Sequence, residues 1–542
     1  MSASSKKKLR KEQQAATLTE KQRKEKKEAK NLKMYSIIFM AVMLVIAVIG
    51  ITVLTINTIK STGVIQKNTT AVTINEHKLD AIQLNYYYYD TINSTVSQWQ
   101  SSYGDMASVY IAMMGLDMSK PLDTQYCEEG KTWADYFLEV AVDRAKADYT
   151  MYDLAMSEGF TMNEEQQANL EIRLANNTFY ATMNYGGNVN DYLRAAYGSG
   201  ASEKTFEDYA TVSAIANAYY NTFCDSLTYD EETLRAHDAE NFNNYTSYTF
   251  DSYYVTYNKY LPEVEKDEEG NVNYTEEQRE NARAAAKVDA DLLGQVSNTK
   301  ELDEAIAALA VNKDSTNATS NKNKNLIYTS VPEALREWVS DEARVDGEVA
   351  VIPSYITTNN EDGTQNSDLY GYYVVIFHSS NDNTKPMSNV RHLLVKFEKD
   401  EDGNITNKEA AKTEADGYLK TWQEGAATED SFIELVKAHS DDSSASTGGL
   451  FEDIYPGSAY VENFLNWSID ANRKFGDAEV IETEYGYHVM FYAGDSDLSY
   501  RDMLITNELK ETAIDEWYNS VMEKTTVVLG DTRFVTKNLV LG

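Results

Sequence analysis

The pattern of apolar and polar positions divides the chain into segments of different character. A run without any charged residue extends over 34–59. It is long enough to cross a bilayer as a helix, which takes about 20 residues. Residues 60–70 are polar, Val72–Ile74 has the alternation of a strand, and most of 78–240 repeats apolar residues at helical spacing. The first half of the chain therefore predicts one membrane helix followed by a mostly helical domain.

Two later stretches share one order of elements. Each has a strand, an acidic turn, two helices, and then a Trp followed by Arg and Gly at offsets of 6 and 9, before a closing Tyr-Gly-Tyr strand. The Trp residues are Trp338 and Trp467. Five matches in one order indicate that 245–380, here the first repeat, and 387–495, the second repeat, are copies of one α+β domain.

Charge separates the N-terminus from the rest. The formal net charge is −37, yet residues 1–33 hold 12 Lys/Arg against 4 Glu. A basic flank favours the cytoplasmic side. An apolar run longer than the roughly 7–15 residues of a signal peptide favours a retained anchor over a cleaved one. We therefore expect a single-pass protein of the cell membrane with its acidic bulk outside.

Composition also excludes some classes of protein. An acidic chain lacks the clustered Lys and Arg that phosphate contacts need, so nucleic acid is not expected as a partner. With 2 Cys the chain is no disulfide-dense scaffold. Whether Cys127 and Cys224 pair stays open. No motif for a metal ion or a cofactor is present, and none is expected.

Candidate chemistry is confined to the second repeat. His392 and His488 fall on its first and last strands, where the first repeat has Ser252 and Tyr373. Between them lie Ser-Asp-Asp-Ser-Ser (440–444) and Gly-Gly-Leu-Phe (448–451), for which the first repeat shows no sequence counterpart. Two histidines and a carboxylate brought together by strand pairing would form a buried polar network. The alternative is two unrelated structural histidines.

The second repeat resembles the parvulin peptidyl-prolyl isomerases in its His-Leu-Leu-Val-Lys, Ser-Asp-Asp-Ser-Ser, Gly-Gly-Leu-Phe and Tyr-Gly-Tyr-His motifs. The resemblance implies that the catalytic network consists of His392, Asp442, Thr483 and His488. It implies a proline-ring wall of Leu450, Tyr460 and Phe464, with Tyr485 beside it. The sequence departs from the family in lacking an Asp after Gly-Gly and in having Tyr485 where a small hydroxyl is common.

The wider layout is similar to the PrsA-type and SurA-type extracytoplasmic foldases. That resemblance implies a helical chaperone domain at 72–240 that is completed by 498–542. Within the latter segment, 532–536 is expected to be a strand that pairs with 72–74. The fold class is therefore predicted as α+β, with a degenerate first repeat.

An isomerase needs no covalent step. Rotation about a peptide bond meets a barrier of about 18–20 kcal/mol, and X-Pro isomerisation takes tens to hundreds of seconds, which is slow enough to limit folding. We therefore expect a membrane-anchored isomerase and foldase acting on unfolded secreted proteins with X-Pro bonds. A non-catalytic holdase is the alternative, and a surface adhesin a third. Client identity, the residue preferred before proline and the oligomeric state, a homodimer included, stay open.

Overall fold

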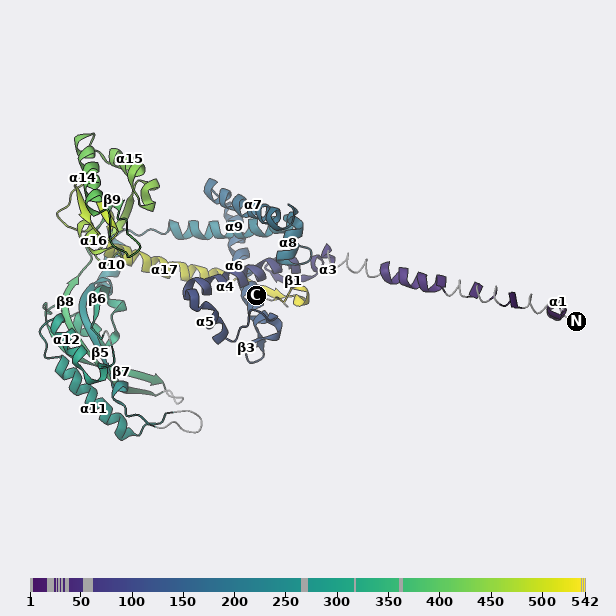
Figure 1. Ribbon diagram of the computed structural model, residues 1–542, viewed down its shortest axis with the longest axis horizontal. Coiled ribbons are helices and arrows are strands. Elements are labelled where there is room, and N and C mark those ends of the chain that lie inside the picture. Colours follow the sequence, from purple (N-terminus) through teal and green to yellow (C-terminus); the bar gives the residue numbers. More distant parts are fainter. Residues whose placement is uncertain are drawn as a thin grey trace. The chain divides into compact units, whose positions relative to one another are not determined.

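The computed structural model describes residues 3–16, 24, 25, 27, 30, 33, 34, 39–51, 62–264, 272–315, 318–359, 364–537, 539 and 541. The chain divides into two compact units, Met1–Leu227 with Ala513–Gly542, and Thr228–Thr512 (Figure 1). Of the expected membrane segment 34–59, residues 35–38 and 52–59 lie outside the described part. Within the described part, no helix combines the length and apolarity that a membrane span requires.

The first unit is mainly helical. Its longer helices are α4 (Ala81–Tyr103), α6 (Trp133–Glu158), α7 (Glu164–Asn184), α8 (Val189–Tyr197) and α9 (Glu203–Ser226), with the shorter α5 (Ala107–Met113) after α4. Asp80 caps α4 by accepting from the amides of Ile82 and Gln83, which satisfies two of its free N–H groups. Gly159 ends α6 in the left-handed conformation that favours glycine.

A small antiparallel sheet joins the two ends of this unit. β1 (Thr70–Ile74) lies between β2 (His77–Asp80) and β13 (Val527–Leu529). Val72 pairs with Leu529, and Ile74 with Val527. The expected partner strand 532–536 was therefore placed too late in the sequence, because Thr532–Phe534 is a 3₁₀ turn that Asp531 caps.

The tyrosines of the first unit mostly pack in its core. Tyr86 stacks on Tyr209 with ring centroids 5.1 Å apart, and Tyr87 meets Tyr209 edge to face at 4.8 Å. The Tyr209 hydroxyl donates to Asp90 at 2.5 Å, and Arg173 pairs with the same carboxylate oxygen at 3.1 Å. The interpretation of these aromatic residues as core, rather than as a client groove, therefore holds for this group.

The second unit contains two four-stranded antiparallel sheets of the same strand order. The first repeat contains β5 (Ser247–Thr256), α11 (Glu276–Leu293), α12 (Thr299–Ala308), β6 (Asn321–Ile327), α13 (Glu333–Val339), β7 (Val349–Asn359) and β8 (Gln365–Asn381), with strand order β6-β5-β8-β7. The second repeat contains β9 (Pro386–Lys396), α14 (Lys408–Glu424), α15 (Glu429–His439), β10 (Leu450–Ile454), α16 (Glu462–Ser468), β11 (Ala478–Glu482) and β12 (Gly486–Ser499), with order β10-β9-β12-β11.

Each sheet has two covered faces because its side chains alternate. In the second repeat, Leu393 and Val489 pack with the two long helices α14 and α15 (Figure 1). Val390 and Met490 point the other way and pack with Phe464 of the short helix α16. The first repeat has the same arrangement, with α11 and α12 on one face and α13 on the other.

The shared Trp-to-Arg spacing has a physical cause. The Arg344 guanidinium lies 4.2 Å from the ring centroid of Trp338, and that of Arg473 lies 4.3 Å from Trp467. In both repeats the arginine stacks on the indole at the end of the short helix, a cation–π contact that fixes the turn into the next strand.

The first repeat does have a strand in the place of β10. β6 lies at the edge beside β5 as β10 lies beside β9. Its sequence, Asn-Lys-Asn-Lys-Asn-Leu-Ile, is mostly polar, so it shows no similarity to Gly-Gly-Leu-Phe. The absence of a sequence counterpart was therefore not an absence of structure.

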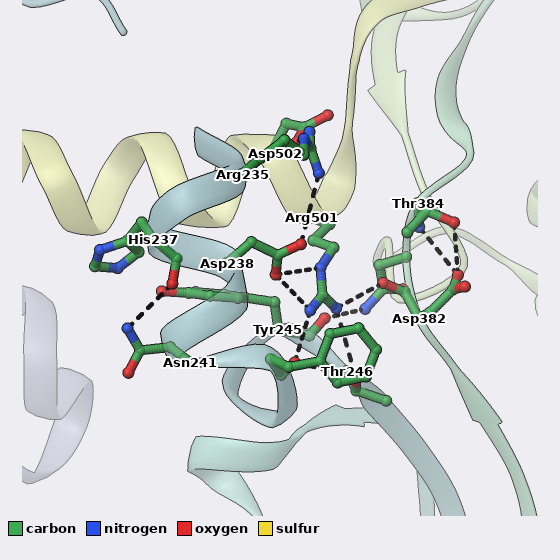
Figure 2. Close-up of polar contacts among 12 residues, drawn as sticks. Arg235, His237, Asp238, Asn241, Tyr245, Thr246, Asp382, Thr384, Arg501 and Asp502 are labelled. Carbon is green, nitrogen blue, oxygen red and sulfur yellow. Dashed lines mark hydrogen bonds and ion pairs between the residues drawn. The ribbon is translucent and has the colours of Figure 1, made fainter. Parts of the chain in front are cut away.

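A buried arginine, Arg501, contacts the segments that lie before, between and after the two repeats. Arg501, at the start of α17 (Tyr500–Met522), is fully buried. Its guanidinium pairs with Asp238 on α10 (Glu231–Glu240) at 2.5 Å and donates to the carbonyls of Phe242 at 2.7 Å and Asp382 at 3.0 Å (Figure 2). This Arg501 cluster therefore joins the entry to the first repeat, the linker between the repeats and the exit from the second.

Candidate functional site

The strand register of the second repeat brings its two histidines together. His392 on β9 is opposite Met490, and His488 on β12 is opposite Leu394, so both side chains lie on the face covered by α16. They are 3% and 5% exposed. The Nδ1 atoms of the two imidazoles are 2.9 Å apart, which is a hydrogen bond between the rings.

A hydroxyl and a carboxylate extend this pair at its two ends. The Thr483 hydroxyl lies 2.8 Å from His488 Nε2. At the other end, His392 Nε2 is 3.5 Å from Asp442 Oδ1 and 3.4 Å from the Ser444 hydroxyl, which itself donates to Asp442 at 2.5 Å. The four residues expected to be catalytic therefore form one continuous chain, and Ser444 is a fifth member.

The Asp442 carboxylate decides which atoms along this chain donate hydrogen bonds and which accept them. The contact with His392 lowers the pKa of Asp442 well below its usual range, despite partial burial, and the Ser444 hydroxyl and amide add to the effect. An ionised Asp442 can only accept a hydrogen bond, so the facing His392 Nε2 carries the proton and His392 Nδ1 accepts from His488 Nδ1–H. His488 Nε2 then accepts from Thr483, and the Tyr485 amide donates to the Thr483 oxygen at 3.2 Å.

The segment that carries Asp442 is held against β9 by its own polar side chains. The Leu394 amide donates to the Ser440 hydroxyl at 3.1 Å, and the Lys396 amide donates to Asp441 at 2.9 Å. The Asp441 amide in turn donates to the Leu394 carbonyl at 2.9 Å. This explains the Ser-Asp-Asp-Ser motif: its first two side chains continue the sheet pairing, and its third faces His392.

Burial keeps His488 uncharged. It lowers the pKa of this imidazole to about 3, and the positive charge that His392 can carry adds to the effect. His488 is therefore neutral at neutral pH and stays neutral into the acidic range. A neutral ring can accept one hydrogen bond and donate another, which is what its place between Thr483 and His392 requires.

Acid is expected to destabilise the second unit through His488. Its pKa in the unfolded chain is about 6.5, so between that pH and about 3 the unfolded state binds a proton that the folded state does not. The free energy of unfolding should fall with falling pH by up to about 1.4 kcal/mol per pH unit. We expect urea unfolding at pH values from 7 to 4.5 to give a free energy of unfolding that depends less steeply on pH in His488→Asn than in the wild type. The other groups titrate equally in both proteins. Parallel slopes would contradict the assignment.

Three aromatic rings form an apolar wall beside the histidines. The Phe464 ring is 5.4 Å from that of His392, and Phe451 is 5.0 Å from it. Tyr460 packs on both, at 5.2 Å from Phe464 and 5.6 Å from Phe451. Such a wall can hold a proline ring next to the polar chain, so the expected positions of Tyr460 and Phe464 agree with the geometry.

The structure places Phe451, rather than Leu450, in this wall. Leu450 is opposite Arg391 on β9, and Arg391 pairs with Glu429 at the start of α15, so Leu450 faces the other side of the sheet. Tyr485 lies on the turn between β11 and β12 and is 56% exposed. Strand alternation, rather than residue type, decides that Phe451 and not Leu450 faces the histidines.

The first repeat has the same register without the same chemistry. Ser252 is opposite Val375 and Tyr373 is opposite Tyr254, which matches the pairings of His392 and His488. The Ser252 hydroxyl accepts from Asn323 at 3.1 Å. With no imidazole at either position, this repeat lacks the polar chain of the second.

A family comparison agrees with this geometry. The model of the rotamase family, the PPIC-type PPIase domain, matches residues 392–493. This part of the chain is a parvulin-type peptidyl-prolyl isomerase domain. The search of curated proteins returns no match.

Several solved structures are similar to the chain. PrsA, a peptidylprolyl isomerase of Bacillus anthracis, is 24% identical over 26% of this chain and 59% of its own, with a TM-score of 0.17. PrsA of Bacillus cereus is 17% identical over 49% of this chain and 91% of its own, with a TM-score of 0.21. A SurA-like chaperone of Campylobacter jejuni is 23% identical over 26% of this chain and 53% of its own, with a TM-score of 0.15. The match thus spans little more than half of the first and third proteins.

The arrangement suits rotation about an X-Pro bond. The aromatic wall can hold the proline ring still while the preceding carbonyl turns, and a fixed polar chain can favour the twisted state over the planar one. Neither step requires a covalent bond. Among the described residues, no group of three or more His, Cys, Asp or Glu side chains could hold a metal ion, and Cys127 and Cys224 are both free thiols.

Proposed function

We propose that this protein is a membrane-anchored, extracytoplasmic foldase whose parvulin domain isomerises X-Pro bonds in unfolded secreted proteins. The observation that carries the proposal is the continuous polar chain from Thr483 to Asp442 beside the aromatic wall. A structural role alone would not require two buried imidazoles that face an apolar wall able to take a proline ring.

A chaperone role has support from α7. This helix buries Leu170 and Ala181 in the first unit but leaves several large apolar side chains in solvent. Ile172 is 58% exposed, Phe179 59% and Met183 68%. An exposed row of apolar side chains on one helix suits weak binding to unfolded chains, because flexible methionine and aromatic side chains adapt to many sequences.

The proposed anchor rests on the sequence. The charge-free run 34–59 follows the basic arm 1–33, and the remaining chain is strongly acidic. A positive flank sets the cytoplasmic side of a single span, so the isomerase domain would lie outside, where secreted proteins fold.

The test combines a peptide assay with refolding of a protein whose folding is limited by proline. The chain from residue 62 onward should raise the isomerisation rate of an X-Pro tetrapeptide above the uncatalysed rate, scanned over residue X, and should speed the refolding. On cell fractionation the full chain should be found with membranes, and the shortened chain should not. A folded chain that leaves the rate unchanged for every X would reject the isomerase. If that chain still suppressed aggregation, the non-catalytic holdase would replace it.

A further inference from the structure

The proline wall depends on a short loop that is held by its own hydrogen bonds and by contacts from outside. Tyr460 is on the connection between β10 and α16, residues 455–461. Within this loop the Ser458 amide donates to the Tyr455 carbonyl at 2.9 Å, the Tyr455 amide donates to the Ser458 hydroxyl at 3.0 Å, and the Tyr460 amide donates to the Ser458 carbonyl at 2.8 Å. Since Tyr460 reaches the wall only from this loop, its position also depends on what holds the loop from outside.

The first repeat supplies one such contact. Asn325, on its edge strand β6, donates from Nδ2 to the Pro456 carbonyl at 2.8 Å. Both residues belong to the same compact unit. The neighbouring Gly457 is also close, because a Cβ atom there would lie 3.7 Å from the Asn325 Cβ. A side chain of the non-catalytic repeat thus bonds directly to the backbone of the pocket loop.

A bulge aims Asn325 at the loop. The register of β5 and β6 shifts between Tyr248 and Phe250, and Asn325 has a φ of +48°. Its amide donates to the Thr249 hydroxyl at 3.1 Å instead of to a strand carbonyl. Bulges redirect side chains next to active sites, and asparagine is among the few residues that tolerate the left-handed region.

The second repeat has the same bulge, but the side chain at its bulged position, Asp453, contacts only residues of the second repeat among the hydrogen bonds described. Asp453 has a φ of +55°, and its amide donates to Asn389 at 3.0 Å, as Asn325 does to Thr249. The Asp453 carboxylate accepts from Ser496 of its own repeat. The bulge therefore belongs to the fold, whereas the amide side chain that reaches the other repeat is particular to Asn325.

A second contact holds the loop from the start of α17. The Tyr455 ring stacks on Tyr500, with centroids 3.5 Å apart and planes at 9°. Tyr500 immediately precedes Arg501, whose backbone amide donates to the Asn383 carbonyl at 3.0 Å and whose side chain forms the cluster in Figure 2. The loop is thus held between β6 and a helix start that the Arg501 cluster fixes.

We propose that the first repeat is a positioning module for the proline pocket of the second, with Asn325 as its positioning residue. Holding Pro456 fixes the loop, and the loop fixes Tyr460 against Phe464 and Phe451. This inference deepens the proposed isomerase function and rests on it. The inference assigns a role to the first repeat, whose equivalent site lacks the histidines. The first repeat shapes substrate binding in the second without touching the reacting bond.

The test removes the amide without changing the backbone. Asn325→Gly accepts the same φ, and Asn325→Asp keeps the shape but places a carboxylate against the Pro456 carbonyl. Asn321→Asp, on an exposed position of the same strand, is the matched control. All are made in the chain from residue 62 onward. Binding of a fluorescein-labelled X-Pro peptide is measured by anisotropy, and kcat and KM are measured separately with the same peptide sequence.

We expect the two Asn325 variants to raise Kd and KM by about three- to ten-fold, the range of one neutral hydrogen bond. We expect kcat to stay within about two-fold, because the polar chain is untouched. Asn321→Asp should match the wild type. In a Tyr460→Leu background the Asn325 effect should disappear, because the two residues act through one loop.

The outcomes separate this inference from the proposed function. A wild type that binds the peptide without isomerising it would reject the function, while the Kd of the Asn325 variants would still decide the positioning role. Wild-type Kd and KM in both Asn325 variants, or an effect that persists without Tyr460, would overturn it. A wild type that binds no proline peptide would reject both.

Discussion

Replacing His392 with alanine is expected to lower kcat/KM for an X-Pro peptide by about 100-fold, the lower end of the range for losing one preorganised polar group. The substitution removes the central member of the chain. Without it, His488 Nδ1 and Asp442 lose the partner that lies 2.9 Å from one and 3.5 Å from the other. A protease-coupled assay measures the rate constant.

The control is another histidine of the same domain. His439, at the end of α15, stacks on Tyr418 with centroids 4.7 Å apart and lies outside the polar chain. His439→Ala should keep the rate within about two-fold, because a surface side chain contributes little to distant geometry. Equal rates in the two variants would show that the polar chain does not take part in the reaction.

Replacing Arg501 with methionine should destabilise the second unit by about 3–5 kcal/mol, because the largely buried carboxylate of Asp238 loses its closest partner and keeps only a 3.6 Å contact to Arg235. Asp238 is 14% exposed and loses both its contacts to the guanidinium, and the carbonyls of Phe242 and Asp382 lose their donors. Urea unfolding followed by tryptophan fluorescence measures the loss.

Two further variants test whether the loss of stability comes from the buried charge of Asp238 or from the loss of any arginine in this region. Arg235→Ala removes a neighbouring arginine that is 44% exposed and should cost about 1 kcal/mol or less. Adding Asp238→Asn to Arg501→Met should restore part of the stability, because position 238 then no longer carries a largely buried negative charge. If Arg501→Met unfolds like the wild type, the Arg501 cluster does not hold the unit together.

Much of the candidate site could be predicted from the sequence because its signals are local. The motif around Asp442 and the strand carrying His488 predict a polar network, and strand alternation then decides which side of the sheet each histidine faces. Phe451 was missed although the same rule identifies it: Leu450 and Phe451 are neighbours on one strand, so only one can face His392. Ser444 gave no signal beyond its place in a serine-rich motif.

The fold was less predictable where pairing depends on distant partners. β6 is nearly all polar, because it is an edge strand with solvent on much of its surface, so the period-2 pattern fails. β13 was displaced by several residues, since three residues of alternating pattern occur in many places by chance. Asn325 could not have been found at all, because its partner, Pro456, is 131 residues away in sequence.

The pairing of β1 with β13 has a consequence for how the protein itself is made. Val72 pairs with Leu529, so the first unit cannot complete its sheet until synthesis has passed both repeats and reached β13. Both repeats of the second unit lie between these strands in sequence and can fold first, while β1 waits with an open edge that could pair wrongly. Contacts this far apart slow folding. A protein proposed to assist the folding of others would thus complete its own folding late, and removal of β13 would expose one edge of β1.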